Sequence, residues 1–164
     1  MLSVGDLAPD FLLTAQDKSI FNTEDYKKHR LLIVFYPAAF TGVCTEEMCS
    51  FADMMSELEN AGCKVVGISV DAPFSNAAFA KSNGIEFPLL SDVHRSVIDA
   101  YGVGYENFVI QGYKVATRSV FLVEPDGKIS YAWAADNPGI QPDYSDVMSH
   151  ICLLYTSPSP RDRS

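Results

Sequence analysis

Cys44 is the residue whose type and place in the chain best suit it to chemistry. Residues 31–36 are continuously apolar and end at Pro37, which is typical of a strand buried on both faces of a sheet. A helix is predicted directly after this strand, and amides at a helix N-terminus stabilise anions. A thiolate at position 44 would therefore be a favoured nucleophile. By position alone, a lone cysteine near a strand end is more often a small buried apolar residue than a nucleophile, so the neighbouring residues must decide.

The residues just before Cys44 favour the nucleophile. Thr41 carries a hydroxyl that can bond a thiolate and then a substrate. Pro37 restricts the chain and offers an apolar wall that excludes water. Gly42 permits a tight path on which the amides near Val43 and Cys44 point into the site. Together these residues predict a thiol site at a strand-to-helix turn.

Strand and helix patterns alternate along the chain and set the frame for this site. Buried strands are predicted at 31–36, 64–70 and 117–123, and helices follow at about 45–59, 75–82 and 94–101, with a last one at 144–150. Two short strands at 10–15 and 19–21 precede them, and residues 128–133 pair back as a hairpin after the turn at 124–127. The pattern predicts an α/β fold with a mixed, mostly parallel central sheet flanked by helices.

Length, charge and cysteine content exclude several classes of protein. A chain of 164 residues fits one domain, and a net charge of −9 argues against nucleic acid or an anionic membrane as partner. The longest apolar stretch, 31–40, is half of the roughly 20 residues that a membrane span needs. The N-terminus lacks the features of a secretory signal, so we expect a cytoplasmic protein. The four cysteines and three histidines lack metal-ligand spacing, so no metal or other cofactor is expected.

The end of the chain departs from the pattern of the rest. Residues 151–164 contain Pro158 and Pro160, show no periodicity and resemble translated sequencing-adapter sequence. We therefore expect the domain to span residues 1–150 and residues 151–164 to be a non-native tail outside the fold. Cys152 is left out of the functional interpretation for the same reason.

Pro37, Thr41 and Cys44 match the P-x-x-x-T-x-x-C motif, and the chain resembles the peroxiredoxins of the alkyl hydroperoxide reductase/thiol-specific antioxidant group. The similarity continues over 34–45 and 49–53, within a thioredoxin-like layout that covers about residues 4–147. It implies a thiol peroxidase that reduces hydrogen peroxide and organic hydroperoxides through a Cys44 sulfenic acid. It also implies an arginine on a later strand, and Arg118, at the start of an apolar run, fits that place.

The spacing of Cys44 and Cys49 resembles the C-x-x-x-x-C arrangement of the bacterioferritin-comigratory (Q-type) and AhpE-like branch. This resemblance implies that Cys49 resolves the sulfenic acid as an intramolecular disulfide, which thioredoxin or a similar dithiol then reduces. Five residues along an intact helix separate the α-carbons by about 8 Å, with the side chains about 140° apart. A disulfide needs α-carbons within about 7 Å. We therefore predict that the first helical turns must unwind. Cys63 opens a buried strand and is interpreted as structural.

Other functions stay open at this point. Cys49 is also compatible with a buried helix-face residue, in which case an external thiol would recycle a one-cysteine peroxidase. A thioredoxin-like disulfide reductase shares the fold but uses C-x-x-C, which this chain lacks. A non-catalytic interaction module would need exposed apolar patches, which the sequence does not reveal. Both a monomer and a homodimer are compatible with the resemblance.

Overall fold

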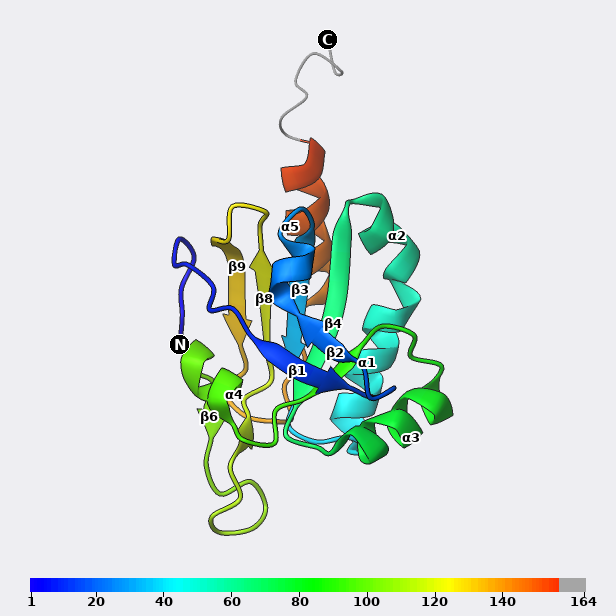
Figure 1. Ribbon diagram of the computed structural model, residues 1–164, viewed down its shortest axis with the longest axis vertical. Coiled ribbons are helices and arrows are strands. Elements are labelled where there is room, and N and C mark those ends of the chain that lie inside the picture. The colour runs from blue at the N-terminus through cyan, green and yellow to red at the C-terminus, as the bar shows by residue number, and fades with distance from the viewer. Residues whose placement is uncertain (157–164) are drawn as a thin grey trace.

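The computed structural model describes the backbone of residues 1–156 and the side chains of residues 1–152 (Figure 1). Residues 157–164, most of the expected non-native tail, lie outside the described residues. Among those it describes, no helix is long and apolar enough to cross a membrane. In chain order the elements are β1 (Leu12–Ala15), β2 (Ile20–Asn22), the 3₁₀ helix η1 (Thr23–Tyr26), β3 (Arg30–Phe35), α1 (Gly42–Asp53), α2 (Met55–Asn60), β4 (Cys63–Ser69), α3 (Pro73–Asn83), β5 (Leu89–Ser91), α4 (Ser96–Tyr101), β6 (Gly104–Tyr105), β7 (Val115–Ala116), β8 (Ser119–Val123), β9 (Ile129–Ala134) and α5 (Tyr144–Thr156).

The central sheet has seven strands in the order β2-β1-β5-β4-β3-β8-β9. The predicted α/β class with a mixed sheet is confirmed, but the prediction of a mostly parallel sheet is wrong. Only the pairs of β4 with β3 and with β5 are parallel, whereas the other four pairs are antiparallel. The reason is that β1 and β8 both run opposite to the parallel core. The small sheet β6–β7 was not predicted, because two-residue strands show no periodicity.

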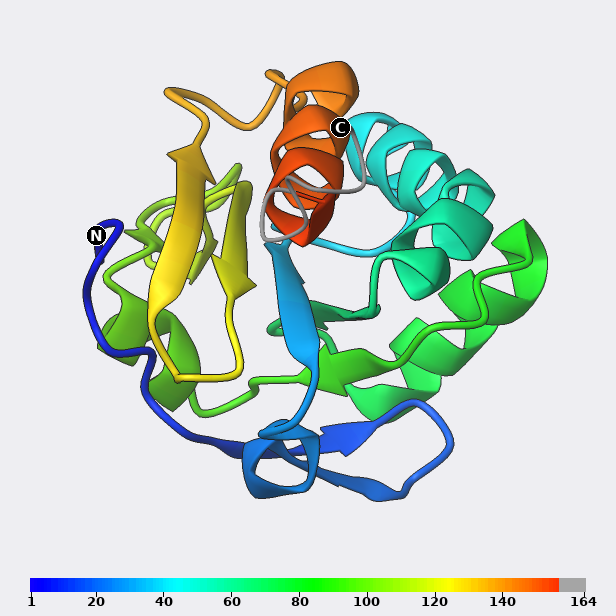
Figure 2. The same cartoon turned by 90° about the horizontal axis from the view of Figure 1, so that it is seen from above.

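Strand β3 lies at the centre and is buried on both faces along its whole length. Leu32 and Val34 face one core, which is covered by α1, α2, α3 and α5. Leu31, Ile33 and Phe35 face the other core, which is covered by α4 and the N-terminal segment. Figure 2 shows the two layers on opposite sides of the sheet. The continuous apolar run therefore arises because alternate side chains serve two separate cores.

Helix α1 packs closely on the sheet because β4 carries glycine beneath it. Gly67 pairs with Val34 in the register of β3 and β4. A Cβ atom at position 67 would lie 2.6 Å from Cε of Met48 and 2.8 Å from Cδ2 of Leu89. A larger residue at position 67 would have to displace these side-chain ends, so glycine leaves room for the contact between α1 and the sheet.

The last helix differs from its prediction. We expected it to end near residue 150, but α5 continues to Thr156. Ile151 lies one turn after Val147, and both are buried in the core on the α1 side of the sheet. Nη1 of Arg30 donates a hydrogen bond to the carbonyl of Ile151 at 2.8 Å and so fastens this turn. The expected stop was wrong because the prolines that break helices lie further along, at 158 and 160.

Replacing Gly67 should destabilise the fold. We expect Gly67→Ala to lower the free energy of unfolding by about 1–3 kcal/mol, because the added methyl group overpacks the contact of α1 with the sheet. Urea denaturation measures the change. Gly42→Ala is the control, since a Cβ at position 42 meets nothing within 4 Å. Equal effects of the two substitutions would contradict this account of the packing.

Candidate functional site

The antiparallel pairing of β3 and β8 brings Arg118 to the predicted thiol site. Phe35, the last residue of β3, pairs with Ser119, the first residue of β8. Arg118 directly precedes β8, so it lies beside the turn that leads from β3 into α1. Its side chain is only 2% exposed. The two distant segments that the sequence linked to the site are therefore neighbours in the fold.

Cys44 lies in the first turn of α1 and is fully buried. Nη2 of Arg118 donates a hydrogen bond to Sγ of Cys44 at 3.2 Å, a contact that favours the thiolate. The N–H of Thr45 bonds the carbonyl of Thr41 at 2.9 Å and opens the helical ladder. The amides that precede Thr45 therefore belong to the helix start, where the helix dipole also favours an anion at Cys44.

Glu47 completes the site, although the sequence analysis did not identify it. Nη1 of Arg118 donates to Oε1 of Glu47 at 2.8 Å, and both side chains are buried. Burial raises the pKa of Glu47 to about 7, while the nearby Arg118 opposes this rise. From sequence, Glu47 would only be a first-turn acid that complements the helix dipole. The overlooked signal was its spacing: it lies three residues after Cys44 and so shares its helix face.

The carbonyl of Pro138 supplies a further acceptor for Arg118. It accepts hydrogen bonds from Nε at 3.1 Å and from Nη2 at 2.8 Å. The planar guanidinium is thus held by three partners: Cys44 and Glu47 of α1, and Pro138 of the segment between β9 and α5. Burial lowers the pKa of Arg118, but Glu47 and Cys44 outweigh it, and the net pKa lies above the ordinary value. Arg118 therefore stays charged beside the sulfur.

Pro37 and Thr41 lie in the turn as predicted, but the Thr41 hydroxyl does not bond the sulfur. Pro37 is buried, and Thr41 is the N-cap residue of α1. Oγ1 of Thr41 donates to the carbonyl of Ala38 at 3.0 Å. Because that bond uses the hydroxyl proton, Oγ1 can act toward a substrate only as an acceptor, through its lone pairs, for example from a substrate O–H.

A second residue not identified from the sequence, Asp71, holds the turn in place. Its Oδ2 accepts hydrogen bonds from the amide of Ala39 and from the hydroxyl of Ser69, each at 2.8 Å. Asp71 follows β4, the parallel neighbour of β3, and side chains that follow adjacent parallel strands meet at one edge of the sheet. Phe40, next in the turn, has a φ of 67° and its ring packs edge-on against Phe79.

The structure does not bring Cys49 and Cys44 together. Both lie in the intact helix α1, and both are free thiols. Sγ of Cys49 contacts Oδ1 of Asn83 at 3.9 Å, at the end of α3. Cys63 is buried as expected, and burial raises its pKa to about 12, so it stays a protonated thiol.

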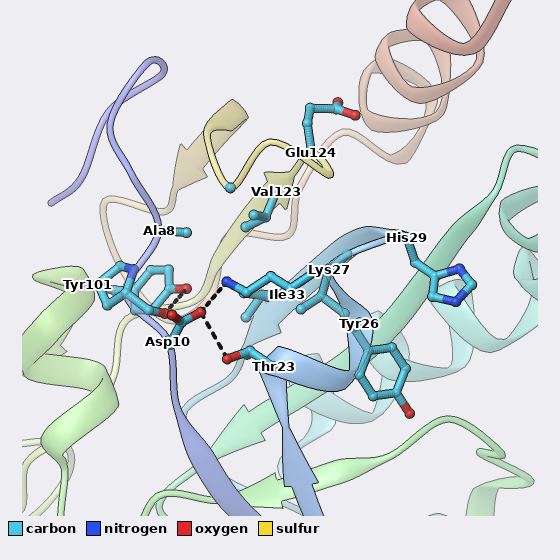
Figure 3. A pocket seen from close by; sticks show the side chains of 13 residues that line it. Ala8, Asp10, Thr23, Tyr26, Lys27, His29, Ile33, Tyr101, Val123 and Glu124 are labelled. Carbon is cyan, nitrogen blue, oxygen red and sulfur yellow. Dashed lines mark hydrogen bonds and ion pairs between the residues drawn. The ribbon is translucent and has the colours of Figure 1, made fainter.

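A small hollow elsewhere is unrelated to the thiol site (Figure 3). It lies over Leu31 and Ile33 on β3, and its volume of about 30 Å³ suits a single water molecule. Asp10 accepts hydrogen bonds there from Lys27 and Thr23, as the dashed lines show. Lys27 lowers the pKa of Asp10 through that bond. Among the residues that line the hollow, Asp10, Thr23 and Lys27 thus already bind one another.

The model of the AhpC/TSA family matches residues 4–132 of the chain. This match covers the β3–α1 turn with Cys44 as well as Arg118. The chain belongs to the AhpC/TSA family of peroxiredoxins, which are thiol peroxidases.

Within that family the similarity is to the Bcp branch. The chain is 40% identical to peroxiredoxin Bcp of Escherichia coli K12 over 133 residues, which are 80% of this chain and 85% of that protein. The crystal structure of peroxidoxin BcpB from Mycobacterium tuberculosis superposes with a TM-score of 0.84 at 26% identity, covering 94% of this chain and 99% of that one. A peroxiredoxin-like protein from Aquifex aeolicus gives 0.83 at 27% identity, covering 93% and 88%. The thioredoxin-like peroxiredoxin fold expected from sequence is thereby confirmed.

Removing the buried carboxyl group should change how stability depends on pH. The pKa of Glu47 is about 7 in the fold against an ordinary 4.5, so between these values the folded state binds more protons than the unfolded chain. The free energy of unfolding should therefore fall by up to about 3 kcal/mol as pH rises through this window. We expect Glu47→Gln to lack this slope in urea denaturation between about pH 4.5 and pH 7.

Glu46→Gln is the matched control for this measurement. It makes the same chemical change on the exposed neighbour of Glu47 and should keep the slope of the parent. A Glu47→Gln protein with the pH dependence of the parent would show that Glu47 does not titrate in this window.

Proposed function

We propose that the Cys44 thiolate is the nucleophile of this peroxidase, and that it reduces hydrogen peroxide and organic hydroperoxides. The observation that carries the proposal is the 3.2 Å contact between Nη2 of Arg118 and the buried sulfur of Cys44. A permanent cation in a site closed to bulk water stabilises negative charge far more strongly than it would in solution. It would do so for the thiolate and for the oxygen that becomes negative as the peroxide breaks.

The reaction is a two-electron displacement at oxygen. The thiolate sulfur forms an S–O bond to the terminal peroxide oxygen while the O–O bond breaks. Sulfur is oxidised, the peroxide is reduced, and the leaving hydroxide or alkoxide takes a proton to become water or an alcohol. Cys44 is left as a sulfenic acid. In this scheme, guanidinium N–H groups and the amides at the helix start stabilise the charge that passes between the two oxygens.

Thr41 and Pro37 act on the substrate in this scheme. The Thr41 hydroxyl is oriented by the Ala38 carbonyl, so its lone pairs can accept a hydrogen bond from the O–H of a hydroperoxide. Pro37 is buried and shields this side of the turn from water. The hydrogen bond to Thr41 orients the O–O bond for in-line attack, while Pro37 limits access of water.

Cys49 is proposed to resolve the sulfenic acid. Its thiolate attacks the Cys44 sulfur, an S–S bond forms, and the displaced hydroxide leaves as water after taking a proton. Because both cysteines lie in one intact helix, α1 must unwind before the bond can close. Thioredoxin or a similar dithiol would then return two electrons and two protons. This cycle needs a reducing compartment, so the cytoplasm is the proposed location, and the enzyme would act as a monomer or a homodimer.

One observation favours a second candidate, a one-cysteine peroxidase. The Cys49 sulfur faces Asn83 at the end of α3, on a side of α1 away from Cys44. If α1 stays wound, an external thiol must attack the Cys44 sulfenic acid instead. The two cycles share the first step and differ only in the thiol that removes the oxygen.

Intact-mass spectrometry separates the two cycles. After one equivalent of peroxide, the parent protein should lose the mass of two hydrogens, because a disulfide forms. Cys49→Ser should instead gain one oxygen, since its sulfenic acid has no partner. Loss of two hydrogens in both proteins would exclude Cys49 as the resolving residue, and a parent protein that gains one oxygen would support the one-cysteine cycle. Cys63→Ser is the control and should behave as the parent does.

Removing the Thr41 hydroxyl should slow the peroxide step. Thr41→Val keeps the shape of the side chain, and we expect the second-order rate constant for peroxide to fall roughly 100-fold, as when one oriented polar group is lost from an active site. Stopped-flow mixing of the reduced protein with hydrogen peroxide gives this rate. Thr45→Val, which removes a neighbouring hydroxyl bound to a helix carbonyl, should have little effect. Unchanged kinetics in Thr41→Val would remove this hydroxyl from the mechanism.

A further inference from the structure

The segment 135–143, which joins β9 to α5, is fastened to the thiol site at two points. At the first, the Pro138 carbonyl accepts two hydrogen bonds from Arg118. At the second, Nε2 of Gln141 donates to Oε2 of Glu46 at 2.7 Å. Arg118 in turn binds Glu47. Glu46 and Glu47, which are consecutive in α1, are therefore both connected to the segment 135–143: Glu46 through Gln141, and Glu47 through Arg118.

Gln141 is itself held from the other side by α5. Its Oε1 accepts a hydrogen bond from the hydroxyl of Tyr144 at 2.5 Å, and the ring of Tyr144 packs edge-on against Phe51 of α1 with centroids 5.3 Å apart. Figure 2 shows α5 alongside α1. The amide oxygen of Gln141 is thus bonded to Tyr144 of α5, while the amide nitrogen is bonded to Glu46 in the first turns of α1.

Those first turns are the ones that must unwind if Cys49 is to reach Cys44. Moving residues 44–48 out of the helix would separate Glu46 from Gln141 and Glu47 from Arg118. The Glu47 contact also serves the chemistry, because Arg118 touches the sulfur. The hydrogen bond between Glu46 and Gln141 involves no reacting atom, so it can resist unwinding of α1 without altering the peroxide step.

We propose that Gln141 is a positioning residue that keeps the first turns of α1 wound and thereby sets how often Cys44 leaves its pocket. This inference rests on the proposed function only for its link to disulfide formation. The mechanical part, a side chain that resists local opening of α1, holds whichever thiol resolves the sulfenic acid.

Hydrogen exchange of the full-length reduced protein tests the mechanical part. Gln141→Glu keeps the acceptor for Tyr144 but loses the donor to Glu46 and opposes two negative charges. We expect the amides of residues 45–48, which donate to helix carbonyls, to exchange about three- to tenfold faster, the change expected for one lost hydrogen bond. The double variant Glu46→Gln, Gln141→Glu exchanges donor and acceptor and should restore the slow rate. Asp136→Asn, on an exposed residue of the same segment, should match the parent.

Hydrogen exchange of the amides in α3 distinguishes local opening of α1 from a general loss of stability. Exchange in α3 should be the same in all variants, and an equal rise in α1 and α3 would overturn the proposal. So would unchanged exchange of α1 in Gln141→Glu, or failure of the double variant to restore it. The peroxide rate of Gln141→Glu should equal that of the parent.

Disulfide formation after a single oxidation provides the functional readout. In Gln141→Glu it should quicken by the same factor as exchange, and an unchanged rate with faster exchange would overturn the link between opening and resolution. Absence of a disulfide in every variant, the parent included, would reject Cys49 as the resolving residue, while the exchange data would still decide the role of Gln141.

Discussion

A buried guanidinium is the interaction on which the thiol site depends. Arg118 is almost fully buried and is bonded to a sulfur and a carboxylate of α1 and to a carbonyl of the segment 135–143. A buried cation is costly unless its donors are satisfied, so each of these partners must be in place for the fold to tolerate it. The hydrogen bonds that stabilise the buried Arg118 therefore also align α1, β8 and the segment 135–143 around Cys44.

The sheet makes this convergence possible. Cys44 follows the end of β3, and Arg118 precedes the start of the antiparallel strand β8, so one register places both at the same edge. The parallel strand β4 adds Asp71 at that edge, where it holds the turn that leads into α1. A purely parallel arrangement would have sent the residue before β8 to the opposite edge, more than 10 Å away for a strand of this length (about 3.3 Å per residue).

The sequence was sufficient to predict the turn of Pro37, Thr41 and Cys44 and the family to which the chain belongs, because local spacing carries both. It predicted the place of Arg118 only through resemblance, since no local pattern links residues so far apart. Glu47 was overlooked because an acid near the start of a predicted helix already has an ordinary explanation. The excess of antiparallel pairs was missed because periodicity reports burial but not strand direction.

The bond that Arg30 makes at the far end of β3 has a consequence for how the terminal helix can evolve. The guanidinium of Arg30 donates hydrogen bonds to the main-chain carbonyls of Ala61 and Ile151 and to the carboxylate of Glu124. A carbonyl is present whatever residue occupies position 151. The hydrogen bond from Arg30 therefore depends on the path of the backbone and not on the identity of the side chain. The end of α5 is therefore free to change its sequence widely, so long as it stays helical and presents an apolar residue to the core, without loss of its attachment to the sheet.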